Sequence, residues 1–99
     1  MKDITSKELK ELLVADSNIK ILDVREAWEF DEGHIEGARN FSLYAIPNGS
    51  DEINDWKDST IYIHCKSGNR SAKAQFLLNG KGFSDVVNLL GGFDDWKAN

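Results

Sequence analysis

The chain contains a single cysteine, Cys65, in a position suited to nucleophilic chemistry. It directly follows the apolar stretch 60–64, and residues 65–71 lead from it into a predicted helix. The first amides of a helix lack partners within the helix and favour negative charge at that end. Such a position, with Lys66 and Arg70 adding positive charge nearby, lowers a cysteine pKa from about 8.5. We therefore expect Cys65 to be a thiolate at neutral pH and to act as a nucleophile.

The loop after Cys65 favours this interpretation but leaves a structural alternative open. Gly68 lets the short loop curl so that successive N–H groups converge on an anion. Lys66, Asn69 and Arg70 are typical of a polar loop rather than of a core. A lone cysteine after a strand, however, is often an inert buried residue. From the loop alone, an active site and a structural turn both remain open.

The two histidines are not expected to act with Cys65. Adjacent residues at a strand end face opposite sides of a sheet, so His64 is predicted to pack or hydrogen-bond beside the sheet rather than to serve as a general base. His34 lies far from Cys65 in the sequence and is predicted to be structural. A Cys-His pair is not required if backbone amides already stabilise the thiolate.

The pattern of apolar residues predicts alternating helices and strands. Thr5 and Glu8 match a capping box that opens the first helix. The further predicted elements are strands at 19–24, 39–42, 60–64 and 86–90, a helical turn at 26–32, a helix at 71–78 that ends near Gly80 or Gly82, and a last helical turn at 93–97. The polar segment 44–56 predicts no regular element. This order predicts an α/β domain with a mostly parallel sheet, in which Cys65 follows the carboxyl end of a strand, where ligands bind.

Length and composition narrow the function further. The 99 residues suffice for one domain, 1–99, with one modest core. A net charge of −5 disfavours nucleic acid and anionic membranes as partners, and no segment is apolar enough to span a bilayer. One cysteine excludes an internal disulfide, and no close spacing of histidine, cysteine and carboxylate side chains predicts a metal site. Because no apolar leader is visible, a cytoplasmic location is expected unless a signal peptide has been removed.

Three motifs, ordered along nearly the whole chain, resemble those of the rhodanese family. The motifs are Asp23-Val24-Arg25-Glu26 with Glu29-Phe30 and residues 33–40 (Gly-His-Ile-Glu-Gly-Ala-Arg-Asn), the loop 65–71 (Cys-Lys-Ser-Gly-Asn-Arg-Ser), and residues 90–96 (Leu-Gly-Gly-Phe-Asp-Asp-Trp). Any one of them could arise by chance, whereas the three in this order are a specific signal.

The resemblance implies a three-layer α/β domain, with a central, mostly parallel sheet and helices on both faces, and it implies a stand-alone sulfurtransferase. Cys65 would carry the transferred sulfur as a persulfide. The substrate-binding loop would consist of Lys66, Ser67, Gly68, Asn69 and Arg70. The expected partners are a small anionic sulfur donor such as thiosulfate and an acceptor that is a thiol, a protein or, in an assay, cyanide. No metal or organic cofactor is expected.

Two alternatives remain beside a sulfurtransferase. Rhodanese-like phosphatases and arsenate reductases have one more residue between the cysteine and the arginine, whereas four residues separate Cys65 from Arg70 here. That shorter spacing matches the sulfur-handling members of the family. The second alternative is a non-catalytic rhodanese-like module that binds a partner protein, although such a module has no need of Cys65.

Other residues of the motifs are interpreted as structural. Arg25 and Glu29 are four residues apart and are predicted to pair along a helical turn, while Asp23 and Arg25 are expected to hold loop backbone. Turns are predicted at Gly33 and Gly37, core positions at Phe93 and Trp96, and no role is assigned to Trp28.

Overall fold

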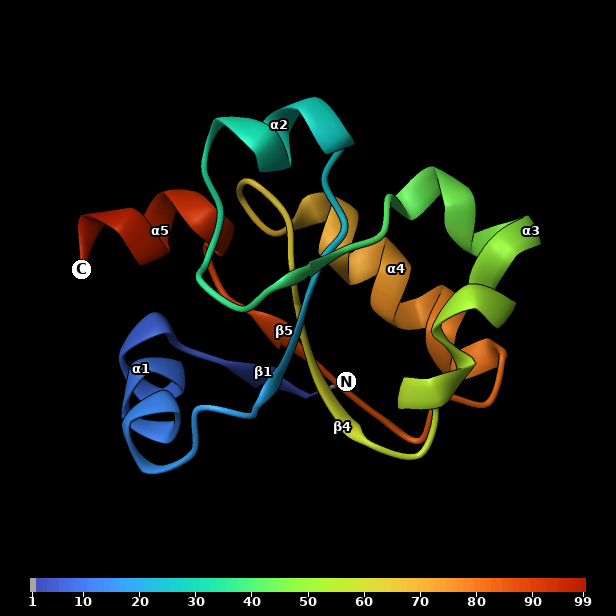
Figure 1. The fold of residues 1–99 in the computed structure, drawn as a ribbon, viewed down its shortest axis with the longest axis horizontal. Coiled ribbons are helices and arrows are strands. Elements are labelled where there is room, and N and C mark those ends of the chain that lie inside the picture. Colours follow the sequence, from blue (N-terminus) through green and yellow to red (C-terminus); the bar gives the residue numbers. More distant parts are fainter. Residues whose placement is uncertain (1) are drawn as a thin grey trace.

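The apolar strands form one five-stranded sheet in which every pair of neighbouring strands is parallel (Figure 1). The computed structural model describes residues 2–99. The strands are β1 (Asp3–Ile4), β2 (Lys20–Asp23), β3 (Arg39–Asn40), β4 (Thr60–His64) and β5 (Asp85–Leu89), in the order β1-β5-β4-β2-β3. The helices are α1 (Ser6–Ala15), α2 (Ala27–Glu32), α3 (Ile46–Gly49), α4 (Asn69–Gly80) and α5 (Gly92–Ala98), with the 3-10 helices η1 (Leu43–Ala45) and η2 (Ser50–Trp56). The prediction of an α/β domain with a parallel sheet is therefore confirmed.

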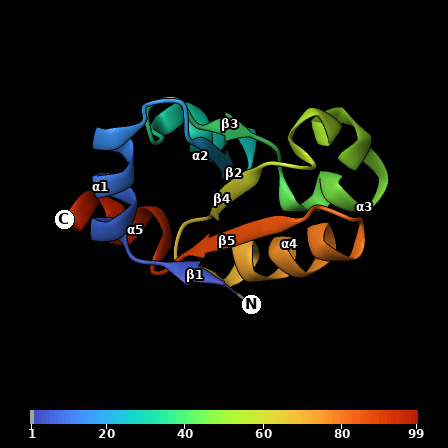
Figure 2. The same ribbon diagram turned by 90° about the horizontal axis from the view of Figure 1, so that it is seen from below.

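Helices cover both faces of the sheet, which gives the three layers that the sequence predicts (Figure 2). Along a strand, successive side chains point to opposite faces. On one face, Ile61 and Ile63 of β4 belong to a buried cluster that includes Leu78 of α4 and residues of η1, α3 and η2. On the other face, Ile21 of β2 belongs to a cluster with Leu9 of α1 and partly buried aromatic residues of α5. Burial on both faces fixes the sheet between the two helical layers.

The carboxyl ends of the parallel strands meet at one edge of the sheet. The register aligns Asp23, the last residue of β2, with His64, the last residue of β4, so that Cys65 emerges at this edge. Helix α2 lies at the same edge, as do the N-termini of α4 and α5 (Figure 1). Segments that are far apart in the sequence thus surround the start of the loop after β4.

Two segments differ from what the sequence pattern predicts. The pattern does not predict β1, which pairs with β5 at the edge of the sheet. This strand has two residues and one apolar side chain, so it shows no alternation. Residues 44–56, for which no element is predicted, form helical turns that bury Ile46 and Ile53. These turns differ in helix type, and therefore no single period connects their buried positions.

Helix α4 begins at Asn69, earlier than the predicted start at residue 71. Its N-cap is Gly68, whose φ of 116° lies in the left-handed region that favours glycine. The loop after β4 therefore extends only from Cys65 to Gly68. Of the two glycines predicted near the helix end, Gly82 has the left-handed backbone (φ 89°), while Gly80 is still helical. The remaining predicted boundaries agree with the structure within two residues.

The capping box at the start of α1 provides a test of the fold's local energetics. Thr5 Oγ1 accepts a hydrogen bond from the Glu8 N–H (3.2 Å), and Glu8 Oε1 accepts one from the Thr5 N–H (3.0 Å). We predict that Thr5→Ala lowers the free energy of unfolding by about 1 kcal/mol, because it leaves a helix amide without its partner. Urea unfolding measures this change. The control Ser17→Ala, at an exposed position, should alter stability by less than about 0.5 kcal/mol; equal effects of the two substitutions would contradict the prediction.

Candidate active site

The sulfur of Cys65 lies at the N-terminus of α4 and is almost completely buried, with the residue 1% exposed. Its Sγ accepts a hydrogen bond from the Gly68 N–H (3.1 Å) and lies 3.5 Å from Ser71 Oγ. Burial raises the pKa of the Cys65 thiol, but hydrogen bonds from the Ser71 side chain and from the amides of Ser71, Gly68 and Ser67 outweigh it. The net result is a pKa below the ordinary value, as predicted for a thiol at a helix N-terminus.

Helix α5 binds two carbonyl groups at the start of the loop. The Phe93 N–H donates to the Cys65 carbonyl (2.9 Å), and the Asp94 N–H donates to the Lys66 carbonyl (3.0 Å). These are amides of the first turn of α5, which have no partner within their own helix. A carbonyl held toward α5 directs the next N–H away from α5, so this contact orients the amides of Lys66 and Ser67, and the Ser67 amide lowers the pKa of Cys65.

A glycine at the start of α5 makes this contact possible. A Cβ atom on Gly92 would lie 2.6 Å from the carbonyl oxygens of both Cys65 and Lys66, which is closer than real Cβ contacts come. The φ of Gly92 is also positive, at 60°. Gly92 is therefore needed for space and for its backbone conformation.

The structure brings the predicted loop residues together around Cys65, but in different roles. The side chains of Ser67 and Asn69 are on exposed residues, and Gly68 supplies an amide. Lys66 is exposed and forms an ion pair with Asp94 (2.8 Å). Its charge is thus paired with a carboxylate of α5, and the groups that lower the pKa of Cys65 are hydrogen-bond donors of Ser71, Gly68 and Ser67 rather than Lys66.

Arg70 forms a two-point ion pair with Glu29 of α2. The distances are 2.6 Å from Nη1 to Oε1 and 2.9 Å from Nη2 to Oε2. The hydrogen bond from Arg70 lowers the pKa of Glu29 to about 2, and burial opposes this only in part. Glu29, with a smaller contribution from the charge of Cys65, raises the pKa of Arg70 above its ordinary value. Both side chains are therefore charged throughout the range in which proteins function.

The predicted pairing of Arg25 with Glu29 is wrong. Arg25 instead forms a buried ion pair with Asp23, with Nε 3.0 Å from Oδ1 and Nη2 2.7 Å from Oδ2. Helix α2 starts only at Ala27, so Arg25 does not lie on the same helical face as Glu29. Arg25 Nη2 also donates to the carbonyl of Gly33 (2.8 Å), which agrees with the predicted structural role of Asp23 and Arg25. The pair fixes the chain at the point where β2 ends and α2 begins.

His64 lies on the opposite side of the sheet edge from the Cys65 sulfur, as predicted. Its ring is fully buried, and the ring centre lies 6.1 Å from that of Phe93. Burial lowers the pKa of His64, so the ring is neutral and its 3.6 Å contact with Asp23 is not an ion pair. Because a neutral ring must donate from Nδ1 to the Cys65 carbonyl (3.0 Å), Nε2 carries no proton and has no hydrogen-bond partner within residues 2–99.

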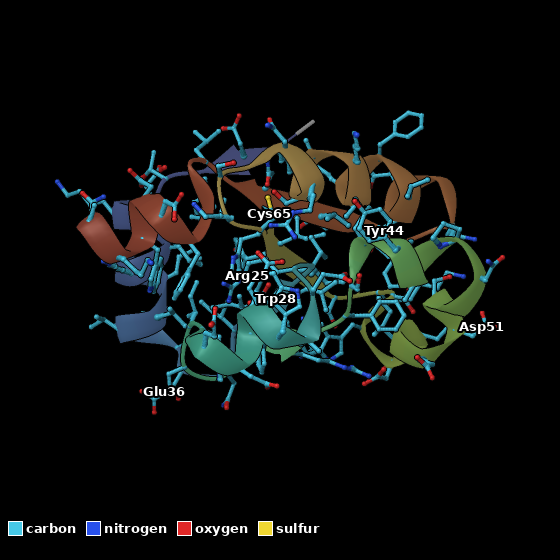
Figure 3. The ribbon with its side chains drawn as sticks, turned by 90° about the horizontal axis from the view of Figure 1, so that it is seen from above. Arg25, Trp28, Glu36, Tyr44, Asp51 and Cys65 are labelled. Carbon is cyan, nitrogen blue, oxygen red and sulfur yellow. The ribbon has the colours of Figure 1, made fainter. Side chains whose placement is uncertain are left out.

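A cavity of about 190 Å³ opens beside the Cys65 loop, between α2 and α5. Its lining includes Trp28, Lys66 and Phe93. Trp28, to which the sequence assigns no role, is 65% exposed at this opening. Phe93 is half-buried, so it is a cavity wall as well as a core residue, whereas the partly buried Trp96 packs against the same core and does not line this cavity. Figure 3 looks onto this edge of the sheet and shows Cys65 between the ribbons of α2 and α4.

Several residues around Cys65 have roles that the sequence does not predict. They are Ser71, Asn88, which contacts Ser71, Gly92 and, as the partner of Arg70, Glu29. Ser71 could have been found, because a residue in the first helical turn after a cysteine can turn its hydroxyl toward the sulfur. Asn88 of β5, whose Oδ1 accepts from Ser71 Oγ (2.6 Å), has no sequence signal, since its role depends on the order of the strands.

A parallel α/β sheet with a cysteine sulfur hydrogen-bonded at a helix N-terminus defines a protein with a candidate cysteine nucleophile. The family model of the Rhodanese-like domain matches residues 5–99, and the chain therefore belongs to this family. Among solved structures, a rhodanese-like domain protein from Staphylococcus aureus is similar with a TM-score of 0.86 and 38% identity, over 97% of this chain and 91% of the other.

Two curated relatives illustrate the family around this chain. The thiosulfate sulfurtransferase GlpE of Ectopseudomonas mendocina is 34% identical over 100 residues, covering 98% of this chain and 85% of GlpE. The putative sulfur carrier protein YrkF of Bacillus subtilis is 34% identical over 94 residues, covering 95% of this chain. The chain spans half the length of YrkF.

Among the helices described within residues 2–99, none has the length and apolar character needed to cross a membrane. In the same part of the chain, no three histidine, cysteine or carboxylate side chains gather where a metal ion could bind.

The contact between Gly92 and the loop generates the first prediction for the site. Gly92→Ala should lower the free energy of unfolding by roughly 2 kcal/mol or more and slow alkylation of Cys65, because the new methyl group displaces the loop carbonyls. Urea unfolding and the alkylation rate at pH 7 measure the two effects. Gly80→Ala is the control, since a Cβ there meets nothing within 4 Å and the backbone is helical. A Gly92 variant as stable and reactive as wild type would disprove the steric argument.

The hydrogen bonds to Cys65 Sγ should lower the pH at which this thiol becomes reactive. The rate of alkylation by iodoacetamide should rise with pH to a midpoint below about 8.5, the value for a free thiol. Ser71→Ala should move this midpoint upward, because losing a hydrogen bond to the thiolate favours the protonated form. Ser67→Ala should leave it unchanged, since Ser67 acts through its amide and its residue is exposed. The prediction fails if both variants titrate alike.

Proposed function

We propose that this protein is a sulfurtransferase that moves a sulfane sulfur from a donor to a thiophilic acceptor through a persulfide on Cys65. The observation that carries the proposal is the Cys65 sulfur, whose pKa is lowered by amides and a hydroxyl at the N-terminus of α4. Family membership supports it, as does similarity to a relative named thiosulfate sulfurtransferase.

The first half-reaction loads the cysteine. The Cys65 thiolate attacks the outer sulfur of a donor such as thiosulfate, the bond between Sγ and that sulfur forms, and the donor's S–S bond breaks. Sulfite leaves with the electron pair of the broken bond, so no external oxidant or reductant is needed. The persulfide retains one negative charge on its outer sulfur, and the N–H groups of the loop are placed to stabilise it.

The second half-reaction unloads the cysteine. An acceptor attacks the outer sulfur, takes it and returns Cys65 to a thiolate. With cyanide the product is thiocyanate, and with a thiolate it is a new persulfide. The similarity to a putative sulfur carrier protein supports a protein thiol as one acceptor in the cell.

The small exposure of Cys65 favours transfer of a single atom. With the residue 1% exposed, a donor reaches the sulfur with a slender terminal atom more readily than with a tetrahedral phosphate group. Four residues between Cys65 and Arg70 also make a smaller loop than that of the related phosphatases. Both observations support a sulfurtransferase over a phosphatase or an arsenate reductase.

Mass measurement tests the proposal directly. After incubation with thiosulfate, the intact protein should gain the mass of one sulfur atom, and cyanide should remove it with release of thiocyanate. Cys65→Ala should show no gain. In the same samples, hydrolysis of a phosphate ester without sulfur loading would replace the proposal with a phosphatase, and the absence of both reactions with every donor would favour a binding module.

A further inference from the structure

The ion pair between Glu29 and Arg70 joins two elements that border the Cys65 loop. Glu29 lies on α2 and Arg70 on the first turn of α4, and their two hydrogen bonds measure 2.6 and 2.9 Å. The side chains are 11% and 26% exposed, so water screens the pair only in part. Two-point pairs between a guanidinium and a carboxylate are among the stronger charged interactions in proteins.

Glu29 is also fixed from its own helix. Its Oε1 accepts a hydrogen bond from the Glu26 N–H (3.0 Å), in the capping box that starts α2. The carboxylate therefore has a defined position whether or not a donor is bound. Because hydrogen bonds from Arg70 lower the pKa of Glu29 to about 2, this negative charge is present at every working pH.

The ion pair with Glu29 reduces the positive charge that Arg70 has available for binding a substrate. Arg70 is close enough to Cys65 for the charge of the thiolate to raise its pKa, after the larger effect of Glu29. Its guanidinium is the expected binding group for an anionic sulfur donor, yet an internal carboxylate already neutralises its charge. A donor with two negative charges must compete with Glu29 for Arg70 and is repelled by Glu29 as well. The pair of Lys66 with Asp94 is far more exposed, at 64% and 45%, and is worth less.

We infer that Glu29 is a positioning residue that sets donor specificity: by occupying the guanidinium of Arg70, it weakens binding of doubly charged sulfur donors relative to donors of lower charge. This inference rests on the proposed function. The site is then expected to favour sulfane sulfur compounds whose end group carries one negative charge or none. It is expected to bind thiosulfate with reduced affinity.

Steady-state kinetics with two donors of the same chemistry test the inference. Thiosulfate carries two negative charges and benzenethiosulfonate carries one, and both transfer an outer sulfur from a sulfonyl sulfur. In Glu29→Gln the KM for thiosulfate should fall about tenfold and that for benzenethiosulfonate about threefold, because the Coulomb energy is proportional to the donor's charge. The kcat values should change little, since Glu29 does not touch the reacting atoms. Glutamine keeps an oxygen that can accept from the Glu26 N–H, so α2 retains its cap.

Two further variants separate this role from a merely structural one. Asp31→Asn removes the same charge from an exposed position of α2 and should leave both KM values within twofold. In Arg70→Gln, adding Glu29→Gln should lower the KM for thiosulfate by clearly less than tenfold, because the competition for Arg70 is already gone and only the direct repulsion between Glu29 and the donor is removed. An unchanged or raised KM in Glu29→Gln, or an equal fall for the two donors, would overturn the inference.

A binding measurement that needs no turnover distinguishes failure of this inference from failure of the proposed function. Sulfate, an inert dianion, should protect Cys65 from alkylation by iodoacetamide, with a midpoint concentration about tenfold lower in Glu29→Gln than in wild type. Equal midpoints, or no protection in either protein, would overturn the inference even if sulfur transfer occurs. Loss of sulfur loading with every donor would refute the proposed function, while a lowered sulfate midpoint would still assign the role to Glu29.

Discussion

The site depends on two hydrogen bonds that run from the first turn of α5 to the loop after β4. By donating to the carbonyls of Cys65 and Lys66, the Phe93 and Asp94 amides decide which way the peptide planes of this loop face. A peptide plane is rigid, so a carbonyl held on one side places its N–H on the other. The docking of α5, which Gly92 permits, thus sets the direction of the Lys66 and Ser67 amides, and the Ser67 amide is one of those that lower the pKa of Cys65.

The charged residues around this loop form ion pairs, and these pairs connect secondary-structure elements. The buried pair of Asp23 and Arg25 fixes the exit of β2, and the pair of Glu29 and Arg70 ties α2 to α4. Removing one partner of a buried pair leaves an uncompensated charge, which is costly, so such pairs specify geometry. The thiol pKa is correspondingly lowered by hydrogen bonds from the loop and from Ser71, not by an unpaired cation.

These hydrogen bonds can stabilise a negative charge on the Cys65 sulfur while the protein groups around it keep their positions. In the proposed mechanism, the amides of Gly68 and Ser71, at the N-cap and in the first turn of α4, would need no reorganisation when the charge moves from Sγ to an outer sulfur. His64 contacts the loop through the Cys65 carbonyl, and burial lowers the pKa of its ring, so the proposed mechanism assigns it no proton transfer. In the same mechanism, the specificity for donor and acceptor would depend on the groups at the opening, among them Glu29 and Trp28.

Local signals in the sequence determined a large part of the fold and of the site around Cys65. The capping box at Thr5, the apolar strand at 60–64 and the cysteine that follows it depend on neighbours a few residues away, and the ordered motifs identified the family. Only the tertiary structure decided which charges pair: Glu29 has its partner 41 residues away rather than four, because the strand order brings α2 beside α4. Ser71, Asn88 and Gly92 acquire their roles in the same way. Hydrogen bonds and ion pairs between distant segments depend on where whole elements are docked, and docking is set by burial of both sheet faces rather than by local spacing.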